Sequence, residues 1–95
     1  MERLVNYIKK NGSKDNPIPN NKISTFLDIS EQTVRKEINN ARCEGITICS
    51  SNKGYWYSED KEDILNTVQS LVNRTTSVNK AIDGMLTGLK VVFKQ

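Results

Sequence analysis

Six polar side chains in one short segment carry hydrogen-bond donors and acceptors at a spacing that suits recognition chemistry. Apolar residues recur through the same segment at Val34, Ile38 and Ala41, a spacing that places them on one face of a helix. The opposite face carries the polar set: Gln32, Thr33, Arg35, Lys36, Asn39 and Asn40. Glutamine and asparagine can pair with the edge of adenine, and arginine and lysine with the edge of guanine. The segment is a candidate for reading base pairs in a major groove, and the plainer alternative is a solvated helix face.

The helix that holds these side chains has recognisable ends. Ser30 is expected to cap its N-terminus, because a serine oxygen can accept a backbone N–H of the first turn. Glu31 adds a favourable negative charge at the same end. Gly45 is expected to end the helix in the left-handed conformation that glycine adopts readily.

A second helix is expected immediately before this one. Asn20 or Asn21 can cap it, and three apolar side chains are expected to face inward: Ile23, Phe26 and Leu27. Where such a helix crosses a nucleic-acid backbone, its polar side chains can hold phosphate. The candidates for that contact are Lys22, Ser24 and Thr25.

A first helix is expected over residues 2–11, with Leu4, Val5 and Ile8 on one face. A polar connection with two prolines follows over residues 12–19, and Ile18 within it can pair at the edge of a sheet.

Residues 46–57 predict a small β-hairpin with strands at 46–50 and 55–57 and a polar turn between them. Lys53 in the turn is placed to touch a sugar-phosphate backbone, and a solubilising turn lysine is the alternative. Because side chains alternate along a strand, Tyr55 and Tyr57 should share one face and Trp56 the other. Core packing is the expected role of these three rings.

The last third of the chain carries a heptad pattern. Steps of four and three residues join eight positions: Ile64, Val68, Leu71, Thr75, Val78, Ile82, Met85 and Leu89. This pattern predicts one helix over 59–89 that frays near Gly84 and Gly88. Its apolar run of about 26 residues spans roughly 39 Å, which is too long for a small domain to cover. We therefore expect a homodimer with these eight residues as its interface, leaving 90–95 as a tail. The alternative is that the helix folds back over the N-terminal domain.

Composition narrows the function further. Residues 1–58 contain nine lysines and arginines against six aspartates and glutamates, whereas residues 59–95 contain five of each. The net positive charge thus lies in the part with the predicted hairpin, which suits a polyanionic partner. There is no histidine, phosphate-binding glycine loop or nucleophile–base pair, so an enzyme is not expected.

Cys43 and Cys49 are the only cysteines, too few for a zinc site without other ligands. We expect two partly buried free thiols in a reducing cytoplasm, with a local disulfide or redox pair as the alternative. No metal or cofactor is expected. The sequence also contains neither a signal-peptide core nor an apolar run long enough to span a bilayer, so we expect a cytoplasmic protein without a membrane partner.

The order of these features resembles the DNA-binding domain of the biotin-operon repressor and the winged-helix group around it. The residues that carry the resemblance are Ser30, Val34, Ile38, Arg42, Gly45, Ile48, Gly54 and Tyr55. The likeness covers about residues 2–57 and implies a winged helix-turn-helix domain over 1–58, mainly α-helical with a small β-hairpin wing. The chain continues directly into the heptad pattern where that repressor would carry an effector domain, and in this it resembles compact DNA-binding proteins of phages and prophages.

Two functions follow from this resemblance and from the heptad pattern. The first is a dimeric, sequence-specific protein that binds double-stranded DNA at an inverted repeat, most simply a transcriptional repressor or regulator. The alternative is a small inhibitor or adaptor, including one for counter-defence, that binds a host protein.

Overall fold

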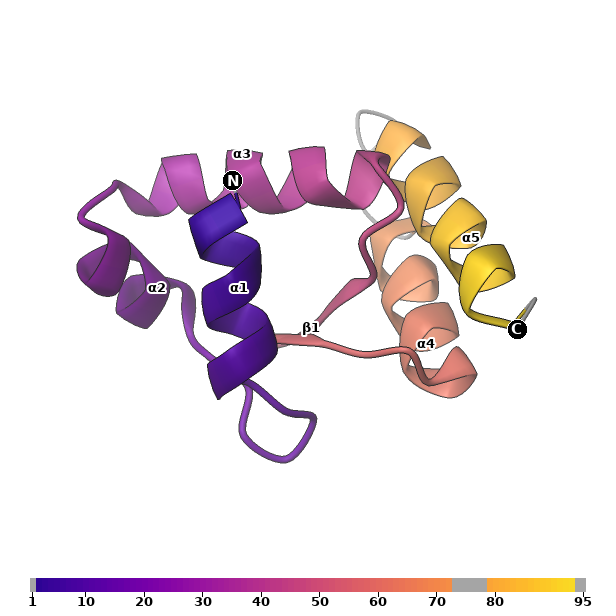
Figure 1. The fold of residues 1–95 in the computed structure, drawn as a ribbon, viewed down its shortest axis with the longest axis horizontal. Helices are drawn as coiled ribbons and strands as arrows, with labels where there is room; N and C mark the ends of the chain where they lie inside the picture. Colours follow the sequence, from indigo (N-terminus) through magenta and orange to yellow (C-terminus); the bar gives the residue numbers. More distant parts are fainter. Residues whose placement is uncertain (1, 73–78, 94–95) are drawn as a thin grey trace.

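The structure of this chain is a computed structural model that describes residues 2–72 and 79–93. Within those ranges the protein is mainly helical, with one antiparallel two-stranded hairpin (Figure 1). In chain order the elements are α1 (Glu2–Asn11), α2 (Asn20–Leu27), α3 (Glu31–Cys43), β1 (Ile48–Ser51), β2 (Gly54–Tyr57), α4 (Lys61–Val72) and α5 (Asn79–Phe93). The expected combination of helices with a small hairpin is therefore confirmed.

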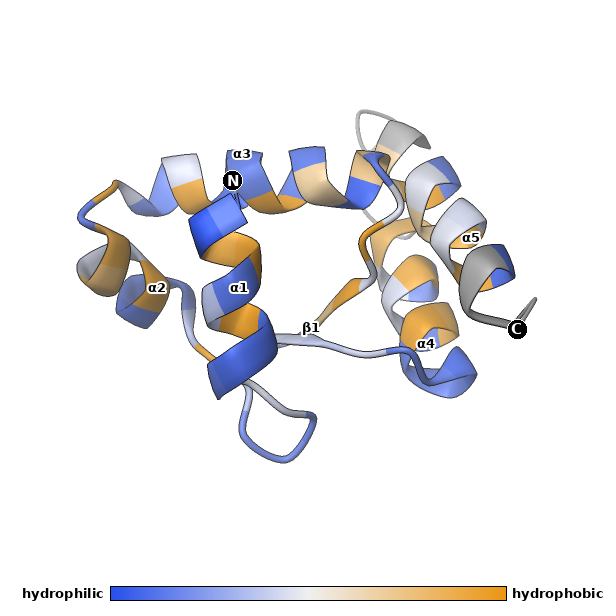
Figure 2. Cartoon of the chain, in the orientation of Figure 1, coloured by the Kyte–Doolittle hydropathy of each residue, from blue (hydrophilic) through white to orange (hydrophobic). Residues whose placement is uncertain are grey.

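The first core lies among α1, α2, α3 and β1, and it uses the apolar faces that the sequence predicts. Figure 2 shows the apolar segments of α3 on its side toward α1. The buried members of this core are Leu4, Val5, Ile8, Ile18, Ile23, Leu27, Val34, Ile38, Ala41 and Ile48. Phe26 is the exception, because 59 % of its surface is exposed and its ring stacks on Tyr7 instead of entering the core. The prediction that Phe26 faces inward was wrong.

The turn between α2 and α3 is tight. Asp28 adopts the left-handed conformation, with a φ of 56°, and its backbone N–H points back to the end of α2. Ser30 then caps α3 as predicted, with its hydroxyl oxygen accepting the N–H of Thr33 at 3.1 Å. Gly45, at a φ of 89°, follows the end of α3 in the expected left-handed conformation.

The predicted cap of α2 differs from the observed one. Pro19 occupies the N-cap position, and no side-chain hydrogen bond caps this helix. Asn20 lies inside the first turn, where its Nδ2 donates to the carbonyl oxygen of Glu31 at 3.2 Å. Asn20 thus joins the start of α2 to the start of α3. The sequence alone favoured asparagine because asparagine is a common capping residue, but proline fixes the entry backbone here.

The hairpin pairs Ile48 with Tyr57 and Ser51 with Gly54. Ile18 extends it, because its N–H donates to the carbonyl of Tyr55 at 2.8 Å and its carbonyl accepts the N–H of Tyr55 at 2.9 Å. The predicted pairing of Ile18 at a sheet edge is confirmed. Gly54 is required beside it, since a Cβ at that position would lie 2.4 Å from the Ile18 carbonyl oxygen.

The three aromatic rings of the hairpin alternate as predicted. Tyr55 and Tyr57 pack against the first core, and Trp56 enters a second core on the other face of the hairpin. That second core consists of Cys49, Trp56, Ile64 and Met85, and Val68 and Leu89 pack against it. It draws residues from β1, β2, α4 and α5, so the C-terminal helices share a core with the hairpin.

The C-terminal part contains two helices where the sequence predicts one. α4 and α5 pack against each other, and α5 also lies across the end of α3 (Figure 1). A single straight helix over 59–89 is therefore wrong. The physical reason is that the apolar pattern is satisfied within the chain: Ile64, Leu71 and Met85 are buried, Val68, Ile82 and Leu89 are half-buried, and Thr75 and Val78 lie outside the described residues.

The two glycines of α5 are contact points. A Cβ on Gly84 would lie 1.8 Å from the carbonyl oxygen of Arg42, and one on Gly88 would lie 2.2 Å from that of Gly45. Both glycines lie within the 15-residue α5, so the expected fraying near them is also wrong. They allow the backbone of α5 to approach the end of α3 more closely than any other residue would.

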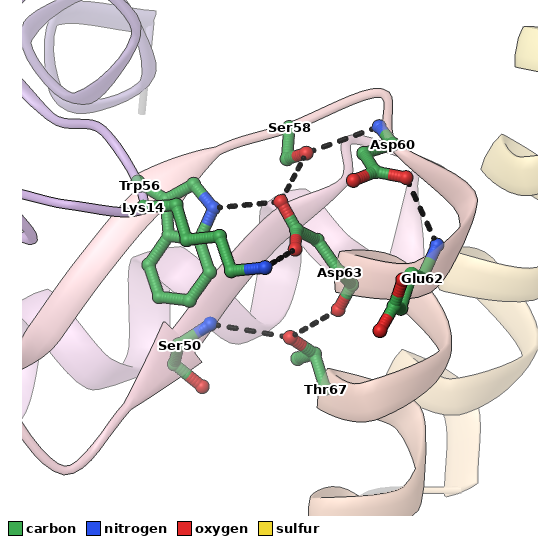
Figure 3. A network of polar contacts seen from close by, with 8 residues as sticks. All are labelled: Lys14, Ser50, Trp56, Ser58, Asp60, Glu62, Asp63 and Thr67. Carbon is green, nitrogen blue, oxygen red and sulfur yellow. Dashed lines mark hydrogen bonds and ion pairs between the residues drawn. The ribbon is translucent and has the colours of Figure 1, made fainter.

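A polar network joins the residue 12–19 connection, the hairpin and α4 (Figure 3). Asp63 is almost fully buried, and its carboxylate accepts hydrogen bonds from Ser58 at 2.9 Å and Trp56 at 3.5 Å. It also pairs with the ammonium group of Lys14 at 3.1 Å. Burial alone would raise the pKa of Asp63, but Lys14, Ser58 and Trp56 together hold that pKa below its usual value.

Candidate nucleic-acid interface

The exposed face of α3 is the centre of the candidate interface. Gln32, Arg35, Lys36 and Asn40 are exposed and Asn39 is half-buried. At 100° per residue, Gln32, Lys36 and Asn39 lie opposite the buried Val34, Ile38 and Ala41 stripe, with Arg35 and Asn40 on the two flanks. These five residues place amide and cationic groups along the outward face of α3, which we call the ridge of α3. The ridge suits a groove that exposes base edges.

Thr33, the sixth predicted residue, lies on the same flank of α3 as Asn40. Its hydroxyl is 2.8 Å from that of Ser30, within the helix cap. Thr33 also lines a separate groove toward α1, together with Arg3 and Glu37. Thr33 differs from the other five predicted residues because its hydroxyl takes part in the cap of α3.

A cleft joins α3 to the hairpin turn. It has a volume of about 230 Å³, and its lining includes Arg35 of α3, Asn20 of α2 and Lys53 of the turn. Both cationic side chains are exposed, and none of the described residues lining the cleft carries a carboxylate. The buried Oδ1 of Asn20 has no hydrogen-bond partner within the described part of the chain. Two predicted phosphate or base contacts from distant parts of the sequence thus meet at one polar cleft.

The three predicted contacts on α2 differ in what they can offer. Lys22 is exposed in the first turn of the helix. The hydroxyl of Ser24 donates to the carbonyl of Ile29, and that of Thr25 donates to the carbonyl of Asn21 at 2.8 Å. A phosphate needs a donor, and the protons of both hydroxyls are already used. Lys22 is the one of the three whose side chain can reach a phosphate without breaking a bond within the protein.

Arg42 is a residue whose role sequence reasoning missed. It is 5 % exposed, and its Nε donates to the carbonyl of Ile48 at 2.8 Å while a terminal nitrogen donates to the hydroxyl of Ser50 at 3.1 Å. Its guanidinium also lies 6.0 Å from the ring centroid of Tyr55. Arg42 thus fixes the hairpin relative to the end of α3. The available signal was its position four residues after Ile38, which continues the buried stripe.

The two cysteines occupy different environments, and both are free thiols. Cys43 is exposed at the end of α3, and Cys49 is buried in the second core, so the expectation that both are partly buried was wrong. Burial raises the pKa of the Cys49 thiol to about 11. Cys49 is therefore a packing residue with little thiolate at neutral pH.

No family model, curated protein or solved structure matches this chain. Among residues 2–72 and 79–93, no helix has the length and apolar character needed to cross a membrane.

Proposed function

We propose that this chain is a winged-helix protein that binds double-stranded DNA, with α3 in the major groove and the hairpin as the wing. The observation that carries the proposal is the cleft in which Arg35 and Lys53 meet, beside the exposed ridge of α3. In this arrangement Gln32, Lys36 and Asn39 face base edges. Lys53 neutralises a phosphate of the flanking backbone, which positions the protein without specifying sequence.

The rigid link between α3 and the hairpin supports the same proposal. Arg42 hydrogen-bonds to β1, and Ile18 pairs with β2, so the turn is held from both sides. A wing that is fixed relative to the recognition helix meets a duplex with little loss of conformational freedom on binding. A repressor acts by occupying its DNA site and excluding other proteins from it. Such a protein needs only to bind DNA, and no catalytic chemistry.

The dimer that we propose does not use the eight heptad positions as its interface. Because Ile64, Leu71 and Met85 are buried within one chain, they are not available to a second copy in this conformation. Among the α4 and α5 side chains that the structure describes, three other large apolar ones are exposed: Leu65, Val72 and Leu86. We place the contact between two copies on that exposed surface, which leaves α3 free in each copy to read one half of an inverted repeat.

The proposal is tested by the salt dependence of duplex binding. We expect log Kd to vary linearly with log salt for the whole chain, and Lys53→Ala to reduce the slope by about 1. Lys61→Ala is the matched control, since Lys61 is also exposed but begins α4 and does not line the cleft. Equal slopes for the two variants would contradict the assignment of the wing. Absence of salt-dependent duplex binding would favour the alternative hypothesis, in which the chain binds a host protein.

A further inference from the structure

A second cleft lies between α1 and α2, away from the cleft at the hairpin turn. It has a volume of about 460 Å³ and is lined by Arg3, Asn6, Tyr7, Lys10, Asn11 and Phe26. We call it the aromatic cleft. None of the outward residues of α3 contributes to its lining, so the two candidate sites use different side chains.

The floor of the aromatic cleft is a pair of stacked rings. The centroids of Tyr7 and Phe26 are 4.2 Å apart, and their planes are inclined by 20°. Tyr7 is half-buried, whereas Phe26 exposes 59 % of its surface. Burying a phenylalanine side chain contributes about 1.5–3 kcal/mol, so leaving it in water forgoes much of a large stabilisation. Ile23 and Leu27 already fill the core beneath α2, so the ring of Phe26 stacks on Tyr7 and keeps most of its surface in solvent.

The walls of the cleft are cationic and polar. Arg3 and Lys10 are two turns apart on α1, with Tyr7 between them, and both are exposed. Of the described residues that line the cleft, none is acidic. The Nδ2 of Asn11 donates to the backbone carbonyl of Tyr7 at 3.0 Å, so the amide of Asn11 lies along the helix. Asn6 is exposed, and its amide is available to a ligand. A matching ligand is anionic, has a flat apolar face and carries hydrogen-bonding edges.

A nucleotide in an unpaired strand has all three properties. Its base can stack on an aromatic ring, its phosphates can pair with Arg3 and Lys10, and its edge can meet an asparagine amide. An acidic peptide would satisfy the cations but would leave the exposed face of Phe26 without a flat partner. We propose that the aromatic cleft binds single-stranded nucleic acid, with a base stacked on Phe26. This inference goes beyond the proposed duplex-binding function and does not depend on it.

The test measures binding of a fluorescein-labelled dT12 to the whole protein by anisotropy at low salt. Phe26→Leu keeps the apolar bulk but removes the π face, and we expect it to weaken binding about 5-fold or more, as loss of one stacked base does. Phe26→Tyr keeps the ring and should bind like the wild type. Lys61→Ala at the start of α4, which lines neither cleft, should also leave dT12 binding unchanged. Because Phe26 is exposed, each variant should retain the melting temperature of the parent, which circular dichroism checks.

A second probe separates stacking from charge. A 12-nucleotide strand with the same phosphates but abasic sugars should bind at least about 5-fold more weakly than dT12. Equal binding of the two strands would overturn the proposal, because charge alone would then account for the affinity. Equal affinity of wild type and Phe26→Leu for dT12, or failure of the wild type to bind dT12, would also overturn it. Duplex binding is measured in parallel, so failure of this inference is distinguishable from failure of the duplex proposal.

Discussion

Substituting Gly84 with alanine tests the packing of α5 against α3. On helix propensity alone, Gly84→Ala should stabilise the protein by about 1 kcal/mol. The structure predicts the opposite sign. The new Cβ would lie 1.8 Å from the carbonyl oxygen of Arg42 and 2.7 Å from its carbonyl carbon. These are backbone atoms, and the same carbonyl accepts the N–H of Gly45 at 3.0 Å, so they cannot turn aside.

The size of the effect follows from the required movement. To bring the Cβ to 3.0 Å from that oxygen, α5 must shift by about 1.2 Å relative to α3. Ala81 and Met85, which are fully buried on the same helix, would lose contacts as it moves. Overpacking of this kind costs about 1–3 kcal/mol, and partial loss of Met85 burial adds to it. After subtracting the gain in propensity, we expect a net destabilisation of about 1–3 kcal/mol.

Thermal and urea unfolding followed by circular dichroism measure this change. A loss of about 1–3 kcal/mol corresponds to a fall in Tm of roughly 4–24 °C for a domain of this size. Asp83→Ala is the matched control, because Asp83 is the exposed neighbour of Gly84 on the same helix and should change stability by less than about 0.5 kcal/mol. A Gly84→Ala variant that is more stable than the parent would refute the reasoning, since a frayed, unpacked α5 would gain from alanine.

Three further predictions concern individual side chains. Asn39→Ala should weaken binding to a preferred duplex by about 1–3 kcal/mol while leaving the melting temperature unchanged; equal affinity for preferred and scrambled duplexes in the parent would contradict this. Asp63→Asn should destabilise the fold by about 1–3 kcal/mol at pH 7. Because the folded pKa of Asp63 is lowered, that contribution is complete above the ordinary value of 3.8 and is lost as the pH falls through the folded pKa, so urea midpoints of parent and variant should converge at acidic pH. At pH 8 a thiol reagent should label the exposed Cys43 of the folded protein rapidly and Cys49 only after unfolding; equal labelling rates would show that the second core is open.

The local elements were predictable because their signals are local. The buried stripe of α3 and the cap at Ser30 depend on residues within a few positions of one another, and both are as expected. The alternation of Tyr55, Trp56 and Tyr57 follows from strand geometry in the same way. The buried stripe also determines which positions of α3 face outward, whereas the contact of the Thr33 hydroxyl with the cap was not predicted.

The tertiary features were not predictable in the same way. A heptad pattern records which face of a helix is apolar, but it does not record what covers that face. Here the cover is the same chain, because Gly84 and Gly88 let α5 approach the end of α3 closely. Phe26 has the spacing of a core residue yet lies outside, since Ile23 and Leu27 already fill the space beneath α2. Such outcomes depend on contacts between distant segments, which periodicity does not describe.

The two cationic residues of the cleft between α3 and the hairpin turn were predictable from the sequence, but their proximity was not. The sequence indicates Arg35 and Lys53 as separate contacts, on a helix and in a turn. Their meeting in one cleft depends on the buried Arg42 and on the pairing of Ile18 with Tyr55, which set where the turn lies.

Selection of bound duplexes from a random pool at physiological salt tests the central claim most directly. We predict enrichment of a defined sequence, and an inverted repeat if two copies bind together through the exposed surface of α4 and α5. Lys36→Ala carried through the same selection should lose preference at the positions that Lys36 contacts. Recovery of no preferred sequence by the parent protein, with only salt-sensitive background binding, would contradict the proposal that α3 reads DNA.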